Sequence, residues 1–238
     1  MIRVGRIIYS HGGPIYPSYP GFSPIVCLTK SSAYGSLGPY VLKTEEGWIM
    51  ENIWQFEKCY PKTPAVCEVM NQYDKRPNWV YPETIFTDAD GNPNAAYWIW
   101  RAKGFNHPYP VRYPVGRAHM HTCLYSLIAP GGERLDYIQA RKRIYLPLYC
   151  ALAQKQTQYH ELSNRLQQGE NLLIIEVDGP HQESLGYYIE KYQVDPTFIE
   201  NNTMLATKFN LQIMLNDSKH PFGHGYCLAS SLLNLELI

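Results

Sequence analysis

Residues 171–180 of the chain read NLLIIEVDGP, an almost unbroken apolar run that stops at an Asp-Gly-Pro sequence. A strand with one wet face alternates apolar and polar residues, whereas a continuous apolar run is typical of a strand with both faces covered. The run therefore predicts a short central strand, and the Asp-Gly-Pro sequence predicts the turn that ends it.

Two acidic residues, Glu176 and Asp178, stand where this strand ends. Alternate residues of a strand share a face, so the two carboxylates are expected to lie on one side. Ligands gather at strand ends in α/β-type packing, which makes the pair a candidate for catalysis. The other interpretation is structural, with Asp178 closing an Asp-Gly turn, and residue spacing leaves both open.

Helical patterns flank the strand. Between residues 134 and 168, apolar residues recur three and four positions apart, which predicts a helix interrupted at Pro147 and a second helix ended by Gly169. Residues 181–219 are predicted to form two further helices, the second starting near Pro196. The apolar segment CLASSLLNLEL predicts a packed terminal helix.

The N-terminal half is predicted to hold short strands. IVCLT at 25–29 predicts a buried strand, and GPYVLKTEEGW at 38–48 predicts a strand, a turn and a returning strand. Residues 71–95 are polar and carry several prolines, which predicts a surface excursion, whereas 95–104 predict a short helix ended by Gly104. Without an internal repeat or linker, these patterns predict a single α+β domain, helix-rich with a few short strands.

Charge and composition exclude some functions. Lys+Arg and Asp+Glu are both 21, and this balance does not support a nucleic-acid surface built on bulk charge. Short basic clusters at 101–104 and 140–143 are interpreted as solvated helix faces.

The N-terminus lacks the apolar core of a signal peptide, and no apolar run approaches the roughly 20 residues that span a membrane. The six cysteines show no CxxC pair, so we expect a soluble cytoplasmic protein with reduced thiols, Cys59 and Cys67 among them.

The sequence MENIWQFEKCYP at 50–61 changes to a helical period and predicts a helix. Glu51, Gln55 and Lys58 are spaced four and three apart, so they share one face, with Trp54 about one turn from Glu51 and Lys58. A carboxylate, an amide and an ammonium on one face suit a polar ligand. The alternative is a solvated helix face that carries an ion pair.

The loop HPFGHGYCLA at 220–229 concentrates histidine and glycine just before an apolar segment. A metal site, a phosphate cradle and an ordinary turn all remain interpretations of it. Its glycines let the backbone approach something closely, and amides at a helix start favour a phosphate or diphosphate. The residues that zinc could use are His119, His121, Cys123, His220, His224 and Cys227. Neither group of three has the paired spacing of a recognised zinc site, so we expect no metal.

Three blocks, in this order, resemble the NADAR superfamily, the YbiA-like proteins. SAYGSLGPYVLKTEEGWIMENIWQFEKCYP is similar to the family's Gly-containing segment, strand, turn and helix with a Glu…Gln…Lys face. RKRIYLPLYCALAQKQTQYHELSNRLQQGENLLIIEVDGP is similar to its long helix, second helix and acidic strand, and HPFGHGYCLASSLL to its closing loop and helix. The chain departs from the family in the long segment between Asp178 and Gly223, and in Phe222, which stands where the family has Trp.

The resemblance implies one such domain over residues 1–238, with insertions around 71–110 and 181–219. It implies an N-glycosidase-type hydrolase that cleaves a ribosyl N-glycosidic bond in a nucleotide containing ADP-ribose or ribose-phosphate. The implied catalytic residues are Glu51, Glu176 and Asp178. The implied substrate-binding residues are Trp54, Gln55, Lys58, Phe222, Gly223, His224 and Gly225.

The chemistry of the residues agrees with this implication. Cleavage of an N-glycosidic bond builds positive charge on the ribose, which a nearby carboxylate stabilises, and a second carboxylate can activate water. We therefore expect Glu51 and Glu176 to face one pocket. No cofactor is expected; the expected partner is a nucleotide-like small molecule, with modified nucleic acid or protein as wider options and no membrane. A non-catalytic binding module for ADP-ribose or a modified nucleotide, and a purely structural protein, are the alternatives.

Overall fold

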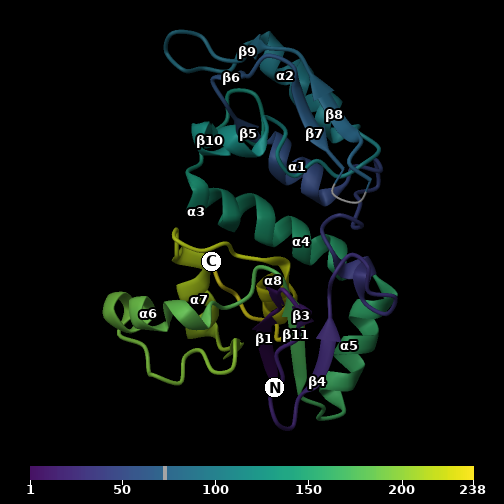
Figure 1. Cartoon of the computed structure of the whole chain (residues 1–238), viewed down its shortest axis with the longest axis vertical. Coiled ribbons are helices and arrows are strands. Elements are labelled where there is room, and N and C mark those ends of the chain that lie inside the picture. The colour runs from purple at the N-terminus through teal and green to yellow at the C-terminus, as the bar shows by residue number, and fades with distance from the viewer. Residues whose placement is uncertain (72–73) are drawn as a thin grey trace. The chain divides into compact units, whose positions relative to one another are not determined.

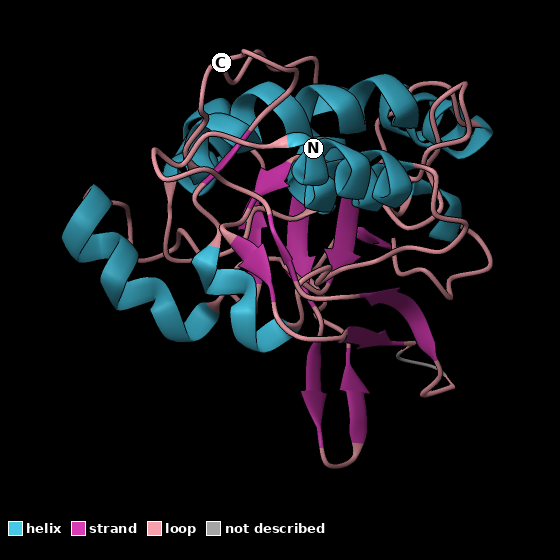
Figure 2. Cartoon of the chain, turned by 90° about the horizontal axis from the view of Figure 1, so that it is seen from above, coloured by secondary structure: helices cyan, strands magenta, loops and turns pink. Residues whose placement is uncertain are grey.

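The computed structural model describes residues 1–71 and 74–238. The chain is a single α+β domain with 36% helix and 19% strand, which confirms the predicted fold class. Figure 2 shows helices (cyan) beside several separate groups of strands (magenta). The domain divides into two compact units: unit 1 comprises residues 1–42 and 146–238, and unit 2 comprises residues 43–145.

A four-stranded sheet lies at the centre of unit 1. Strand β11 (Leu172–Glu176) runs between β1 (Ile2–Arg6) and β4 (Ser23–Val26), parallel to both, and β12 (Thr203–Leu205) pairs antiparallel with β1. Every residue of β11 is buried. The continuous apolar run of this strand thus has neighbours on both edges and cover on both faces, as predicted.

Helix α8 (His224–Leu232) packs against β1 and β11, as Figure 1 shows in yellow. Its residues from Gly225 onward are all buried. Leu173 and Ile175, which share one face of β11, pack instead with Ile7 beneath Tyr19 and Phe22. The core of unit 1 therefore has a helical layer and a layer formed by the N-terminal loops.

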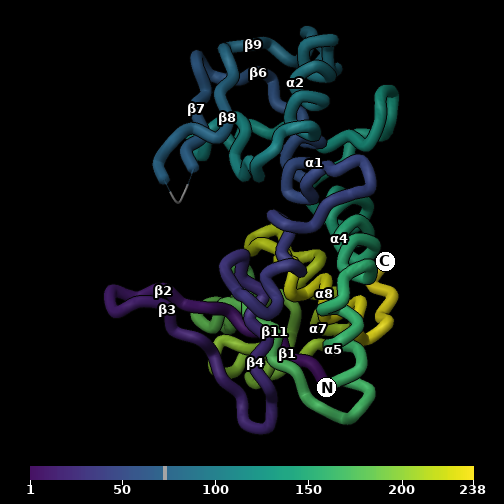
Figure 3. The backbone as a smooth tube through the Cα atoms, turned by 90° about the vertical axis from the view of Figure 1, so that its right-hand side faces the viewer, coloured from purple at the N-terminus to yellow at the C-terminus, as the bar shows by residue number. Residues whose placement is uncertain are grey.

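The remaining elements of unit 1 are short. They are β2 (Ile8–Ser10), β3 (Gly13–Ile15), η1 (Gly35–Leu37), α4 (Leu146–Ala153), α5 (Thr157–Gln167), η4 (Gln182–Ser184), α6 (Leu185–Tyr192) and α7 (Lys208–Asn216). The hairpin β2–β3 extends away from the sheet of its own unit, as Figure 3 shows. Helices α4, α5 and α7 contact α8.

Unit 2 combines one helix pair with two-stranded ribbons. Its elements are α1 (Met50–Phe56), β5 (Lys58–Cys59), β6 (Lys62–Thr63), β7 (Cys67–Met70), β8 (Pro77–Tyr81), β9 (Thr84–Ile85), α2 (Ala95–Phe105), η2 (Arg117–Thr122), β10 (Tyr125–Ser126), α3 (Tyr137–Ala140) and the π-helical η3 (Arg141–Tyr145). Its core is aromatic: the Phe56 ring lies 4.7 Å from Trp79 and 4.6 Å from Trp100, and Trp100 lies 5.0 Å from Phe86. Rings of this size stabilise a small core through large buried areas.

The helical predictions around β11 are largely confirmed. The region 134–168 forms α3, η3, α4 and α5, and the π-helical segment ends at Tyr145, two residues before Pro147. Gly169 adopts a positive φ of 88°, and its N–H donates to the Leu166 carbonyl, as expected of a helix-ending glycine.

Other element predictions were wrong. Residues 74–95 are not a surface excursion, because β8 pairs with β7 and both Trp79 and Phe86 are buried. The helix predicted over 95–104 is confirmed as α2 (Ala95–Phe105), but Gly104 does not end it; the missing side chain of Gly104 makes room for the Phe56 ring. Residues 38–48 form turns, and a single bridge pairs Lys43 with Ile49.

The second helix within 181–219 was also misplaced. It begins at Lys208, where the Thr207 side chain accepts from Asn210 N, because β12 occupies the segment before it. Of the predicted insertions, 181–219 lies in unit 1 and 71–110 lies in unit 2, with residues 72 and 73 outside the described residues. Over the residues described, none of the helices is both long enough and apolar enough to cross a membrane.

Candidate functional site

Unit 2 links three polar side chains in one hydrogen-bond chain. Lys58 Nζ donates to Gln55 Oε1 over 2.8 Å, and Gln55 Nε2 donates to Glu51 Oε1 over 2.8 Å. Glu51 and Gln55 are 5% and 7% exposed, so the chain lies largely away from water. The predicted common face is therefore formed, although Lys58 stands just beyond the helix, in β5.

Lys58 is the cation of this cluster, and it is half-buried. Burial lowers the pKa of Lys58 to about 8; Cys123 and then Glu51 act to raise this pKa, and nearby Arg112 acts to lower it. Lys58 Nζ also lies 4.6 Å from the centre of the Trp54 ring, within cation–π range. A lysine whose pKa is this close to neutrality, beside a buried carboxylate, is typical of functional sites.

An aromatic group extends from Trp54. Its ring centre lies 5.1 Å from Tyr145 and 6.2 Å from Tyr137. The Arg141 guanidinium carbon lies 4.2 Å from the centre of the Tyr137 ring, and Arg141 is only 1% exposed. Arg141 belongs to the π-helical segment, a geometry found frequently at functional sites.

Sequence reasoning missed Arg141 and Arg112. The basic cluster at 140–143 was interpreted as a solvated helix face, and for Arg141 that interpretation is wrong because the side chain is buried. A usable signal was present: Tyr137 and Arg141 are four residues apart, so they share a helix face. Arg112 carries no such pattern, because it stands in a proline-rich loop.

Unit 1 holds the second group of predicted residues, centred on Glu176. Glu176 is 1% exposed, and its Oε1 accepts from Gly225 N over 2.8 Å. Its Oε2 lies 3.0 Å from His224 Nδ1, and His224 Nε2 lies 2.8 Å from the Cys27 carbonyl oxygen. These contacts tie the end of β11 to the start of α8, where the helix dipole also favours a negative charge.

His224 is held as a cation by this arrangement. Burial acts to lower the pKa of His224, but the charge and hydrogen bond of Glu176 raise it, and the net effect is a pKa above the usual value. Both ring nitrogens then donate, one to the carboxylate and one to the carbonyl. Asp178 is half-buried in the bend after β11, and its charge raises the pKa of His224 in the same direction.

The glycines of the loop are explained by this carboxylate. A Cβ built on Gly225 would lie 2.7 Å from Glu176 Oε1, and one built on Gly223 would overlap the same carboxyl group. The close approach expected of these glycines is therefore made by a side chain of the protein itself. Phe222 is buried and stacks on Tyr226 with ring centres 5.1 Å apart.

The histidines that zinc could use either pair with carboxylates of the protein or lie exposed. His224 pairs with Glu176, and His220 Nδ1 lies 2.6 Å from Asp217 Oδ2. His119 and His121 are exposed on η2. Among residues 1–71 and 74–238, no group of three or more His, Cys, Asp and Glu side chains is placed to hold a metal ion. Cys59 and Cys67 are buried free thiols.

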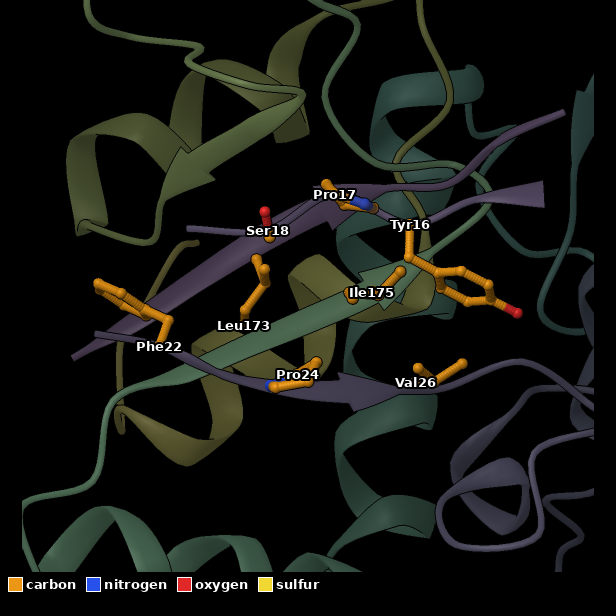
Figure 4. Close-up of a pocket in the computed structure, with 8 residues that line it drawn as sticks. All are labelled: Tyr16, Pro17, Ser18, Phe22, Pro24, Val26, Leu173 and Ile175. Carbon is orange, nitrogen blue, oxygen red and sulfur yellow. The ribbon is translucent and has the colours of Figure 1, made fainter. Parts of the chain in front are cut away.

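A separate apolar cavity of about 320 Å³ lies against the sheet of unit 1. Figure 4 shows Leu173 and Ile175 on β11, facing a wall formed by the loop after β3 and by β4. The lining residues are Tyr16, Pro17, Ser18, Phe22, Pro24, Val26, Leu173 and Ile175. Such a lining suits an apolar group and supplies no carboxylate, amine or imidazole.

The structure thus brings the predicted residues together in two sets. Glu51, Trp54, Gln55 and Lys58 form one set in unit 2, and Glu176, Asp178 and the 222–225 loop form the other in unit 1. The expectation that Glu51 and Glu176 face one pocket stays a prediction, because the two stand in different units.

Comparison with known proteins identifies no relative. No protein-family model matches the chain, and neither curated proteins nor solved structures give a significant match.

Proposed function

We propose that unit 2 carries an N-glycosidase site centred on Glu51, which hydrolyses the ribosyl N-glycosidic bond of a nucleotide containing ADP-ribose or ribose-phosphate. The observation that carries the proposal is the buried hydrogen-bond chain from Glu51 through Gln55 to Lys58, with the Trp54 ring beside it. The resemblance of residues 50–61 to the NADAR helix with its Glu…Gln…Lys face supports the same assignment.

In this reaction the bond between the ribose C1′ and the base nitrogen breaks, and the electron pair leaves with the base. Positive charge develops on C1′ and the ring oxygen, and the Glu51 carboxylate stabilises it more strongly in a dry site than in water. Water then adds to C1′ and loses a proton, and the base gains one. Gln55 holds the orientation of Glu51 through its amide N–H.

Lys58 contributes charge to substrate binding. At neutral pH a lysine with a pKa of about 8 is still mostly protonated, so its ammonium can pair with a phosphate oxygen. Trp54 presents a ring beside this cation, as a base-stacking surface does.

Glu51 is favoured over Glu176 as the catalytic carboxylate because a lysine and an indole ring, groups that suit a phosphate and a base, accompany it. Both oxygens of Glu176 contact the protein itself, one at the Gly225 amide and one at His224. A carboxylate in an internal ion pair of this kind is costly to unpair. In this proposal, Glu176 and Asp178 raise the pKa of His224, and Glu176 also orients its ring.

The test is release of free base from NAD, ADP-ribose-containing nucleotides and ribosylamine phosphates, measured by chromatography. Glu51→Gln should lower turnover by about two to three orders of magnitude while ADP-ribose binding, measured by calorimetry, persists. Glu68→Gln is the matched control, since Glu68 is an exposed glutamate of the same unit on β7.

Two results would decide against the enzyme. Equal turnover in Glu51→Gln and the parent would remove Glu51 from the reaction. Calorimetric binding without base release from any substrate would instead favour the binding module, whose carboxylate only orients ribose hydroxyls. Lys58→Ala should weaken binding of phosphate-bearing ligands in either case.

A further inference from the structure

A second group of side chains lies in unit 1, built from residues of two different segments. Ser184 Oγ lies 2.9 Å from His220 Nε2, and His220 Nδ1 lies 2.6 Å from Asp217 Oδ2. Ser184 ends η4, and Asp217 and His220 stand three residues apart in the segment between α7 and α8. A serine, a histidine and an aspartate in this relation are recognised by geometry, whatever their order in the chain.

The hydrogen-bond network assigns the protons. Asp217 is fully buried, and it accepts from Tyr187 Oη over 2.6 Å, Tyr188 Oη over 3.0 Å and Lys219 N over 3.1 Å. Tyr188 Oη also lies 2.9 Å from His220 Nδ1. Because Tyr188 donates its proton to Asp217 Oδ2, its oxygen can only accept from His220, so Nδ1 carries the proton and donates it to Oδ2. Its Nε2 is then the acceptor for the Ser184 hydroxyl, which is the tautomer that a general base requires.

The charge on Asp217 is secured by these donors. Burial acts to raise the pKa of Asp217, but hydrogen bonds from Tyr187, His220 and Tyr188 outweigh it and hold this pKa below the usual value. An ionised aspartate at Nδ1 stabilises the imidazolium that forms when His220 accepts a proton.

Ser184 is placed as a nucleophile rather than as a helix cap. It stands at the N-cap of α6, yet its side chain makes no capping hydrogen bond and is directed to His220 instead. It is half-buried, so part of it is open to solvent.

We propose that Ser184, His220 and Asp217 form a second catalytic site, which hydrolyses small carboxylic esters. Ser184 Oγ attacks the ester carbonyl carbon while its proton passes to His220 Nε2. The C–O bond to the alcohol then breaks, and the alcohol leaves with that proton, so that an acyl-Ser184 ester remains. Water, deprotonated by His220, attacks the acyl carbon; the acid is released and Ser184 regains its proton. N–H groups at the start of α6 adjoin Ser184 in the chain and are the nearest candidates to stabilise the oxyanion.

The test uses the whole protein, a fluorophosphonate probe and p-nitrophenyl acetate. The probe should label Ser184, as located by peptide mass spectrometry, and acetate release should pass through an acetyl group on the same residue. Ser184→Ala should abolish labelling and lower ester hydrolysis by at least about 100-fold. Ser31→Ala is the matched control and should retain both, since Ser31 is a half-buried serine of the same unit whose Oγ accepts from Tyr34 N.

Asp217 acts through His220 and is a positioning residue. Asp217→Asn should lower kcat and the labelling rate of Ser184 in the same proportion, with KM unchanged, whereas a purely structural aspartate would change the melting temperature alone.

The proposal is overturned if Ser184 stays unlabelled under conditions that label a known serine hydrolase, or if Ser184→Ala hydrolyses the ester at the parent rate. Glu51→Gln should leave this activity intact, so the site stands or falls independently of the proposed glycosidase.

Discussion

Glu51 and Glu176 are both buried carboxylates, at 5% and 1% exposure, but their partners differ. Glu51 Oε1 accepts from a neutral amide that is itself bonded to Lys58. Glu176 pairs directly with the His224 cation and accepts a hydrogen bond from the Gly225 amide at the N-terminus of α8. The Glu176 charge is balanced within unit 1 by His224, whereas the hydrogen bond from Gln55 fixes the orientation of the Glu51 carboxylate.

The lowered pKa of Lys58 predicts the pH at which this lysine becomes reactive toward acylation, and Glu51 affects that pH. An ordinary lysine titrates near 10.4, but burial lowers the pKa of Lys58 to about 8, against the charge of Glu51. The rate of Lys58 acylation by a dilute anhydride should therefore reach half its plateau near pH 8. Cys123 and Glu51 both raise this pKa, and Glu51→Gln removes the Glu51 contribution, so the midpoint should move lower still.

The measurement is competitive labelling followed by peptide mass spectrometry over pH 6–11. Lys62, whose side chain is 60% exposed, reports reagent access in the same sample. Glu68→Gln should leave the Lys58 midpoint unchanged. A Lys58 midpoint near 10 in the parent would show that the site is more hydrated than its geometry indicates.

At the scale of elements, the pair Glu176–His224 joins β11 to α8 and gives stability a pH dependence. The pKa of His224 is raised in the folded protein above the unfolded value of 6.5. The folded state therefore binds more protons between 6.5 and the raised value, and unfolding free energy falls as pH rises through that window. The stabilisation is complete below pH 6.5.

His224→Gln should remove this dependence. At pH 6 the variant leaves Glu176 without its cation, and the unfolding free energy should drop by roughly 3–5 kcal/mol. The difference from the parent should shrink as pH rises above 6.5, measured by urea denaturation at each pH. His160→Gln, at an exposed histidine of α5, should show no such trend. A difference that stays constant from pH 5 to 9 would contradict a charged pair.

Packing between α1 and α2 depends on Gly104. A Cβ built there overlaps the Phe56 ring, which is held between Trp79 and Trp100. Gly104→Ala should therefore destabilise the protein by about 1–3 kcal/mol, despite the better helix propensity of alanine. Gly186→Ala in α6 is the control: nothing lies within 4 Å of its Cβ, so it should be neutral or stabilising by up to about 1 kcal/mol. Equal thermal shifts in both variants would contradict the close approach.

The sequence predicts an element when a continuous pattern of neighbouring residues determines it, and fails when contacts between distant residues determine it. The apolar run of β11 and the helical period at Met50 were recognised because their patterns are continuous. Trp79 and Phe86 were assigned to a surface excursion because prolines and polar residues surround them, and only the pairing of β8 with β7 buries Trp79. Gly104 shows the same limit, since a glycine that admits a distant ring resembles one that ends a helix.

The candidate sites follow the same rule. The Glu51–Gln55–Lys58 chain was predictable because it lies within one helical period. The histidines of the HPFGHG loop were visible, and the partner of His224 could not be predicted because Glu176 ends the distant strand β11. Asp217 stands only three residues before His220, a spacing that the sequence shows, but this pair was not predicted. Ser184 was not predicted, because its relation to His220 exists only after η4 and the loop before α8 are folded together.

At the scale of the whole molecule, the two units differ in how many segments of the chain form them. Unit 2 is one continuous segment, 43–145, whereas unit 1 is assembled from two segments. Unit 2 also contains its own aromatic core and every residue of the Glu51 cluster. A continuous segment with a separate core has what independent folding requires.

We therefore expect residues 43–145, expressed alone, to fold with a cooperative thermal transition. Trp79 and Trp100 are each 2% exposed or less, so their fluorescence in the fragment should be blue-shifted and resistant to quenching by iodide. Trp100→Ala should cost about 3–5 kcal/mol in fragment and full chain alike, because the ring fills the same core. Lys58 in the fragment should also keep its titration near pH 8, since the groups that set this pKa all belong to unit 2. A fragment that folds but titrates Lys58 near 10 would place part of the Glu51 site outside unit 2, and a fragment without a cooperative transition would contradict its independence.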